Sequence, residues 1–146
     1  MVRVFLDANM ISAAAHWPQG RARALFRLAA AGRCELVASP HAILEARRNL
    51  GLKSPRGAEA VDSLLEWVEK VAEAGPQMVE SAAGHGLQGS DAPILAAAVA
   101  AGVDFLATGD RTRFGHLFGR DVGGVRIVSP AEALESVLEV WDREAG

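Results

Sequence analysis

The order of apolar and polar positions along the chain predicts short strands that alternate with helices. Runs of apolar and β-branched residues bounded by turn residues predict strands at residues 2–6, 34–38, 77–79, 103–107 and 125–128. Apolar residues at helical spacing predict helices over residues 20–31, 40–50, 58–74 and 92–101, and a last helix that opens at residues 129–132. The 92–101 segment is apolar on every side, which indicates a helix that is buried all round.

This alternation of strands and helices indicates a parallel α/β sheet covered on both faces. We therefore expect a single doubly wound domain over residues 1–146, with about five parallel strands flanked by helices. A helical hairpin over roughly residues 40–74 is expected between the second and third strands. We expect residues 51–57 to form a turn and the glycine-rich residues 81–90 to form an exposed, mobile connection.

The composition narrows the class of protein and its surroundings. The formal net charge is −3, so the chain lacks the overall basic character of a typical nucleic-acid-binding protein, and a basic surface would have to be local. Cys34 is the only cysteine, which excludes an internal disulfide and predicts a cytoplasmic location. No apolar stretch is long enough to cross a bilayer, and Asp7 interrupts the first apolar run, so we expect neither a membrane segment nor a signal peptide.

Two acidic residues come directly after predicted strands. Asp7 follows the strand at 2–6, and Asp110 follows the strand at 103–107. In an open parallel sheet the functional crevice lies beyond the carboxyl ends of the strands, and a common doubly wound strand order makes these two strands neighbours. We therefore expect the two carboxylates to lie close together.

Asp91 and Glu45 are two further acids whose roles the pattern leaves open. Asp91 opens the all-apolar helix, where an acid is equally explained by favourable interaction with the helix dipole and by a functional role. Glu45 points away from the apolar side of its predicted helix, and periodicity alone favours a solvated ion pair with Arg48. If several carboxylates gather, they raise one another's pKa unless a cation neutralises them. Oxygen ligands suit Mg²⁺ or Mn²⁺, and such a site predicts phosphodiester chemistry.

Four segments together resemble a known family. They are "VFLDANMISAA" (4–14), "VASPHAILEARRNL" (37–50), "SDAPILAAAVAAGVDFLATGDRTRF" (90–114) and "VRIVSPAEAL" (125–134). In this order they resemble the PIN domain, in particular its PilT N-terminus-like and VapC-type toxin branch, over nearly the whole chain. The resemblance implies a Mg²⁺- or Mn²⁺-dependent ribonuclease, commonly a homodimeric toxin that a small antitoxin protein silences.

The resemblance also assigns the site. It implies that the acidic metal site consists of Asp7, Glu45, Asp91 and Asp110. Asn9 matches the polar position that supports the first acid, and Thr108 matches the residue that orients substrate or a water. For Glu45 this implication replaces the solvated-pair interpretation.

The implied reaction is in-line attack of water on an RNA phosphodiester bond. A bound ion would orient the phosphate and lower the pKa of a water that a carboxylate deprotonates, and the products would carry 5′-phosphate and 3′-hydroxyl ends. Arg111 and Arg113 follow Asp110 closely enough to contact phosphate oxygens, although an ordinary solvated charge is the simpler explanation for each. Relatives often carry another acid just before the Asp91 position; residues 87–90 offer none, so we do not expect a second fully occupied metal site.

Three alternative functions stay open at this point. One is a housekeeping RNA-processing nuclease without an antitoxin, and another is a PIN module that binds RNA or protein without cleaving. The full set of acids argues against the second, because mutually repelling carboxylates have no physical reason to persist in a lapsed site. A phosphotransfer receiver is the third, but the chain lacks that fold's adjacent acids and its lysine after the last strand.

Overall fold

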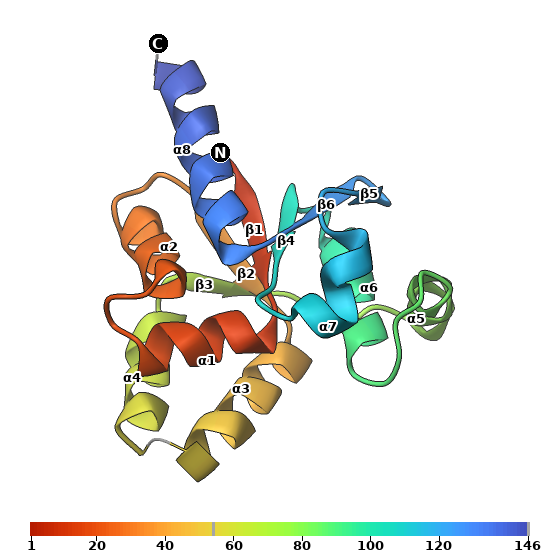
Figure 1. Ribbon diagram of the computed structural model, residues 1–146, viewed down its shortest axis with the longest axis horizontal. Coiled ribbons are helices and arrows are strands. Elements are labelled where there is room, and N and C mark those ends of the chain that lie inside the picture. The colour runs from red at the N-terminus through yellow and green to blue at the C-terminus, as the bar shows by residue number, and fades with distance from the viewer. Residues whose placement is uncertain (54, 146) are drawn as a thin grey trace.

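A computed structural model describes residues 1–53 and 55–145 of the chain (Figure 1). The strands are β1 (Arg3–Leu6), β2 (Glu35–Ala38), β3 (Val68–Lys70), β4 (Phe105–Ala107), β5 (Asp121–Val122) and β6 (Val125–Val128). The helices are α1 (Ala8–His16), α2 (Arg21–Ala30), α3 (Pro40–Lys53), α4 (Pro55–Leu65), α5 (Pro76–Ala83), α6 (Asp91–Ala101), α7 (Arg111–Phe114) and α8 (Pro130–Ala145), with a 3₁₀ turn η1 (Gly115–Leu117).

The strands form one doubly wound sheet in the order β3-β2-β1-β4-β6-β5. β3, β2, β1, β4 and β6 are parallel to one another, which confirms the predicted fold class, and β5 pairs with β6 in the antiparallel direction. β1 lies between β2 and β4, with Leu6 opposite Ala107. The expected neighbourhood of the first strand and the strand before Asp110 is therefore confirmed.

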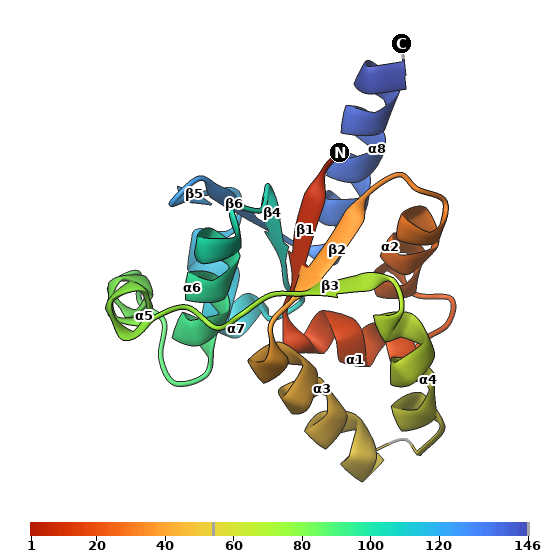
Figure 2. The same ribbon diagram turned by 180° about the vertical axis from the view of Figure 1, so that it is seen from behind.

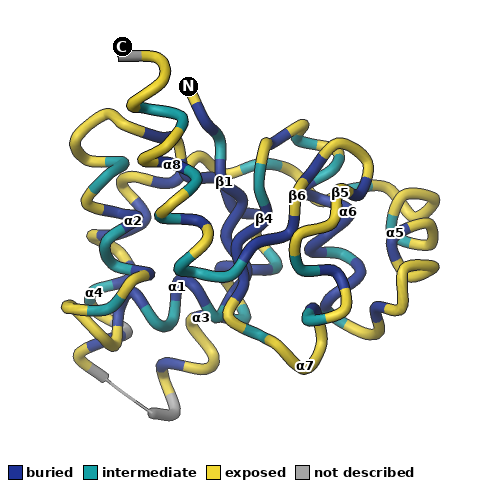
Figure 3. Tube along the Cα trace, turned by 45° about the horizontal axis from the view of Figure 1, so that its top comes forward, coloured by how far each residue is buried: buried dark blue, intermediate teal, exposed yellow. Residues whose placement is uncertain are grey.

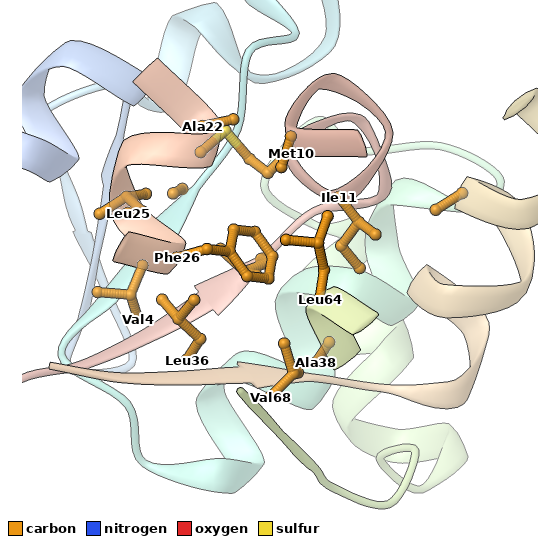
Figure 4. Close-up of a cluster of buried hydrophobic side chains, with 14 of the residues drawn as sticks. Val4, Met10, Ile11, Ala22, Leu25, Phe26, Leu36, Ala38, Leu64 and Val68 are labelled. Atoms are coloured by element: carbon orange, nitrogen blue, oxygen red, sulfur yellow. The ribbon is translucent and has the colours of Figure 1, made fainter. Parts of the chain in front are cut away.

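Helices cover both faces of the sheet because its strand residues point alternately to either side. Val4 and Leu6 face the core that α1, α2, α4 and α8 cover, whereas Phe5 faces the core under α6 (Figures 1 and 2). Figure 4 shows the first core, where Phe26 of α2 lies among apolar side chains of the sheet, α1 and α4. Most of α6 is buried, as its all-apolar sequence predicts.

The predicted third strand and the helix before it are wrong. The helix predicted over residues 58–74 ends as α4 at Leu65, and Val68–Lys70 is the real third strand. Residues 77–79, predicted as a strand, lie in α5, where Gly75 is the N-cap and Pro76 the first helical residue. The predicted helix was too long because apolar residues continue at helical spacing beyond the end of α4. Val68 keeps this spacing but lies in a strand that pairs with β2.

Smaller differences occur at helix ends and loops. The turn predicted over residues 51–57 is wrong in extent, because α3 runs to Lys53 and α4 begins at Pro55; Ser54 lies outside the described residues. Helix α1 and strand β5 are additional elements, and residues 81–83 belong to α5 rather than to the connection that follows it. In the part of the chain that the structure describes, no helix combines the length and the hydropathy needed to cross a membrane.

Candidate active site

The carboxyl ends of β1 and β4 place two sequence-distant segments side by side. The backbone N–H of Asp7 donates a hydrogen bond to the Ala107 carbonyl at 3.1 Å, which continues the strand pairing by one residue. Asp7 then caps α1, and Asp110 caps α7. Helices α1, α3 and α7 all begin at this edge of the sheet (Figure 1), the position that the strand order predicts for a functional crevice.

A closed network of hydrogen bonds holds the Asp7 side chain. The Thr108 hydroxyl donates to Asp7 Oδ2 at 2.8 Å, and Asn9 Nδ2 donates to the same oxygen at 3.1 Å. The Asn9 amide also accepts from the Gly109 N–H at 2.9 Å, and Thr108 Oγ1 accepts from the Asp110 N–H at 3.1 Å. Asn9 therefore contacts Asp7 as predicted, and it also locks the 108–110 turn onto the start of α1.

Thr108 contacts three polar residues of the site. Its side chain is fully buried, and its hydroxyl forms hydrogen bonds with Asp7, Asn9 and the Asp110 backbone. These bonds hold the Asp7 carboxylate, which is a supporting place in the site. The orientation of substrate or a water by Thr108 stays a prediction.

Burial raises the pKa of the Asp7 carboxyl to about 6, from an ordinary value of 3.8. Repulsion from Asp91 and Glu45 raises it further, while the hydrogen bonds from Thr108 and the Ala8 backbone lower it. The Ala8 N–H lies 2.7 Å from Asp7 Oδ1. Asp7 is therefore a carboxylate whose proton affinity is close to what acid–base chemistry near neutral pH requires.

Asp91 lies at the start of α6, beside Asp110. Burial raises the pKa of Asp91, the Arg113 guanidinium lowers it, and the charges of Asp110 and Glu45 raise it again. Asp91 and Asp7 are two of the four buried polar or charged residues among those described, with Thr108 and Ser39. A capping role alone does not require an acid to be buried beside other charged side chains, so the surroundings of Asp91 favour a functional role.

Asp110 serves two structures at once. Its Oδ1 accepts the backbone N–H groups of Thr112 and Arg113 at 3.1 and 2.9 Å, which is the capping interaction of α7. Its Oδ2 lies 3.5 Å from the Arg113 Nε atom. One oxygen of Asp110 therefore caps α7 and the other faces Arg113.

Glu45 is close to the other acids. It contributes to the raised pKa of both Asp7 and Asp91, which places its charge beside them. Among the described residues its side chain shows no ion pair with Arg48; its Oε2 lies 4.0 Å from His41 Nε2 instead. The solvated-pair interpretation is therefore wrong. Repulsion acts between Asp7 and both Asp91 and Glu45, and between Asp91 and both Asp110 and Glu45.

Arg113 and Arg111 differ although both belong to α7. Arg113 lies between Asp91 and Asp110, whereas Arg111 forms no ion pair with any described residue. A cavity of about 510 Å³ borders Arg113 and Asp91, and Gln88, Ser90 and Thr112 contribute polar groups to its walls. Figure 3 shows that the segment around α7 is largely exposed.

Sequence reasoning missed His41 as a member of the site. His41 Nε2 is buried, lacks a hydrogen-bond partner within the described residues and lies 4.0 Å from Glu45 Oε2. The His41 backbone N–H donates to Glu73 at 2.7 Å. The signal was the i, i+4 spacing of His41 and Glu45 on a predicted helix.

The donor set suits a hard divalent cation in its chemistry. Carboxylate oxygens are the ligands that Mg²⁺ and Mn²⁺ prefer, and the mutual repulsion of these acids is what a cation would relieve. As the side chains lie, however, the described residues contain no group of three or more His, Cys, Asp or Glu placed closely enough to hold an ion. The positive charge between Asp91 and Asp110 comes from Arg113.

Comparison with known proteins supports a PIN-domain fold. The sequence model of the PIN domain matches residues 3–112. No curated protein matches the sequence.

Several solved structures share the fold. VapBC2 from Rickettsia felis, bound to a DNA fragment from its promoter, aligns with a TM-score of 0.65 and 14% identity, covering 88% of this chain and 98% of that one. FitAcB from Neisseria gonorrhoeae gives 0.58 and 20%, covering 88% and 98%. VapC20 from Mycobacterium tuberculosis, a toxin that cleaves the sarcin–ricin loop, gives 0.57 and 17%, covering 77% and 94%. At these identities the likeness concerns the fold.

Proposed function

Since this chain belongs to the PIN domain family, we propose that it is a Mg²⁺- or Mn²⁺-dependent endoribonuclease and the toxin of a toxin–antitoxin pair. The observation that carries the proposal is the gathering of four acids from four segments at one edge of the sheet. They are Asp7, Glu45, Asp91 and Asp110; burial raises the pKa values of Asp7 and Asp91, and the charges of neighbouring acids raise them further. An arrangement that costs stability in this way is typical of a functional site.

In this proposal Asp7, Glu45, Asp91 and Asp110 hold the ion. When bound, Mg²⁺ or Mn²⁺ supplies Lewis-acid stabilisation of the negative charge that phosphodiester hydrolysis develops. One of these carboxylates would accept a proton from the attacking water. Asn9 and Thr108 fix the orientation of Asp7 through their hydrogen bonds.

Substrate contacts are assigned to the basic side chains of α7. Arg111 has no competing ion pair within the described residues, so its guanidinium is available to RNA phosphates. The chain as a whole is acidic, with 15 basic and 18 acidic residues, so RNA binding depends on such local groups. VapC20, which shares the fold, is a toxin that cleaves the sarcin–ricin loop, and this supports RNA as the substrate class.

The partner and the assembly follow from the resemblance to VapC-type toxins. We propose a small antitoxin protein as the partner, a homodimer as the working form and the cytoplasm as the location. Induced expression of the chain alone should arrest growth, and Asp110→Asn should relieve the arrest. A housekeeping nuclease without an antitoxin would leave growth unaffected at the same expression level.

Cleavage of defined RNAs tests the activity. Purified protein should cut at least one member of a panel of tRNAs and ribosomal RNA loops, the sarcin–ricin loop included, in Mg²⁺ or Mn²⁺. Excess EDTA and the Asp7→Asn substitution should each abolish the cut. Asp104→Asn is the matched control, because Asp104 precedes the other end of β4 and accepts the Arg3 backbone N–H at 2.8 Å, a bond that asparagine can keep. Cleavage that persists in EDTA and in Asp7→Asn would rule out this site.

A further inference from the structure

Arg113 occupies the position between two of the four acids. Its Nη1 atom lies 3.6 Å from Asp91 Oδ1, and its Nε atom lies 3.5 Å from Asp110 Oδ2. Asp91 belongs to the start of α6 and Asp110 to the turn after β4, so one guanidinium links two segments of the site. The described part of the chain shows no other arginine or lysine in an ion pair with any of the four acids.

The contact is electrostatic and has little geometric rigidity. Both distances exceed that of a good charge-assisted hydrogen bond, which is about 2.7–2.9 Å between nitrogen and oxygen. The Arg113 side chain is 56% exposed, whereas the side chains of Asp91 and Asp110 are 12% and 26% exposed. The two acids are held in the fold, and the ion pairs recorded for the guanidinium are those with these two acids. The guanidinium can therefore leave without breaking packed structure.

The surroundings provide room for that movement. The cavity of about 510 Å³ borders both Arg113 and Asp91, and Thr112 and Gln88 offer it polar groups. The loop side of this cavity is fixed, because His116 Nε2 donates a hydrogen bond to the His85 carbonyl at 2.7 Å. An arginine side chain rotating away from Asp110 would enter this space.

We propose that Arg113 is the site's own counter-cation, which a divalent ion displaces from between Asp91 and Asp110. The proposal rests on the proposed metal-dependent function. Arg113 neutralises the acids while no ion is bound, and a Mg²⁺ or Mn²⁺ ion has to compete with its guanidinium for the same oxygens. Arg113 is thus a positioning residue of the site and a determinant of metal affinity.

Mn²⁺ binding to Arg113→Gln measures the competition directly. Glutamine keeps a polar side chain and removes the charge. Because the guanidinium makes two partly exposed ion pairs, and such pairs are individually weak, the Kd for Mn²⁺ should fall by roughly five- to ten-fold. Isothermal titration calorimetry at about pH 8, where the carboxylates are ionised, gives the affinity without any RNA or activity.

Arg111→Gln is the matched control. It removes the same charge from the same short helix, so it reports the effect of net charge alone, and we expect its Mn²⁺ affinity to stay within about two-fold of the unmodified protein. Thermal unfolding with and without Mn²⁺ provides a second measurement, since tighter binding to the folded state raises the Tm further. The Mn²⁺-induced rise should be largest for Arg113→Gln.

The outcomes separate this proposal from the proposed function. Tighter Mn²⁺ binding by Arg113→Gln than by Arg111→Gln supports displacement. Equal or weaker binding by Arg113→Gln, with the unmodified protein still binding Mn²⁺, overturns the role of Arg113 and leaves the metal site standing. Absence of Mn²⁺ binding in all three proteins overturns both.

Discussion

Replacing Asp7 by asparagine should change the pH dependence of folding stability in a way that the burial of this carboxyl dictates. Asp7 is 5% exposed, and its pKa is raised from 3.8 to about 6. The asparagine side chain would keep a similar shape but would not titrate. The difference in unfolding free energy between the two proteins therefore isolates the ionisation of one side chain.

The sign and size follow from the two pKa values. The folded protein binds the Asp7 proton more tightly than the unfolded chain does, so ionisation between about pH 4 and pH 6 destabilises the fold. The raised pKa of about 6 corresponds to about 3 kcal/mol in all, of which about 2 kcal/mol falls between pH 4.5 and pH 7.5. Raising the pH over this interval should therefore destabilise the unmodified protein by about 2 kcal/mol relative to Asp7→Asn.

Urea unfolding at a series of pH values provides the assay. The asparagine amide meets hydrogen-bond donors at the Asp7 position, and this adds a constant offset to the difference in unfolding free energy. The test is therefore how this difference changes with pH, not its value at one pH. Asp104→Asn serves as the control, because Asp104 is exposed at the opposite end of β4. A difference between Asp7→Asn and the unmodified protein that stays flat, or that favours the unmodified protein as pH rises, would refute the assigned burial cost.

Substitutions at two further positions test local structure, one beside the site and one at the start of α8. Thr108→Val should lower the unfolding free energy by about 2–3 kcal/mol, because it removes the hydroxyl that donates to Asp7 and leaves the partly buried Asp110 N–H without its acceptor. Thr108→Ser should cost only about 1 kcal/mol in the same urea titration. Ser129→Ala should cost about 1 kcal/mol, since Ser129 Oγ accepts the Glu132 N–H at the start of α8. Equal losses for the valine and serine variants, or no loss for Ser129→Ala, would contradict these assignments.

The part of the site formed by β1 and β4 could be predicted from the sequence because a general topological rule applies to it. Acids after parallel strands gather at one edge of the sheet, and the strand order places Asp7 beside the Thr108–Asp110 turn. Asp91 and Glu45 follow no such rule. They enter the crevice from helices α6 and α3, and helix periodicity cannot tell a side chain facing another acid from one facing water. Only the family resemblance selected Glu45.

The two edge strands of the sheet, β3 and β5, were not predicted because they are very short. β3 is three residues long with one buried side chain, so it carries almost no period-2 signal, and its pairing with β2 is a tertiary interaction. β5 has only two residues, although its hairpin had a usable signal. Gly123 and Gly124 adopt φ values of 57° and 89°, and a glycine pair between two valines is typical of a two-residue hairpin that needs positive φ at both positions.

The site uses two different physical means to hold an excess of negative charge. At Asp7 the neutral donors of Thr108, Asn9 and the backbone stabilise the carboxylate, yet the pKa remains raised, because hydrogen bonds from neutral groups only partly offset burial and repulsion. At the Asp91–Asp110 side a guanidinium is present, and its charge lowers the Asp91 pKa that burial raises. Burial is the largest cause of the raised pKa at Asp7, and repulsion from Asp91 and Glu45 adds to it, whereas the displaceable cation lies at Asp91 and Asp110. An ion held by these acids would relieve the repulsion around Asp7 and would meet its competitor between Asp91 and Asp110.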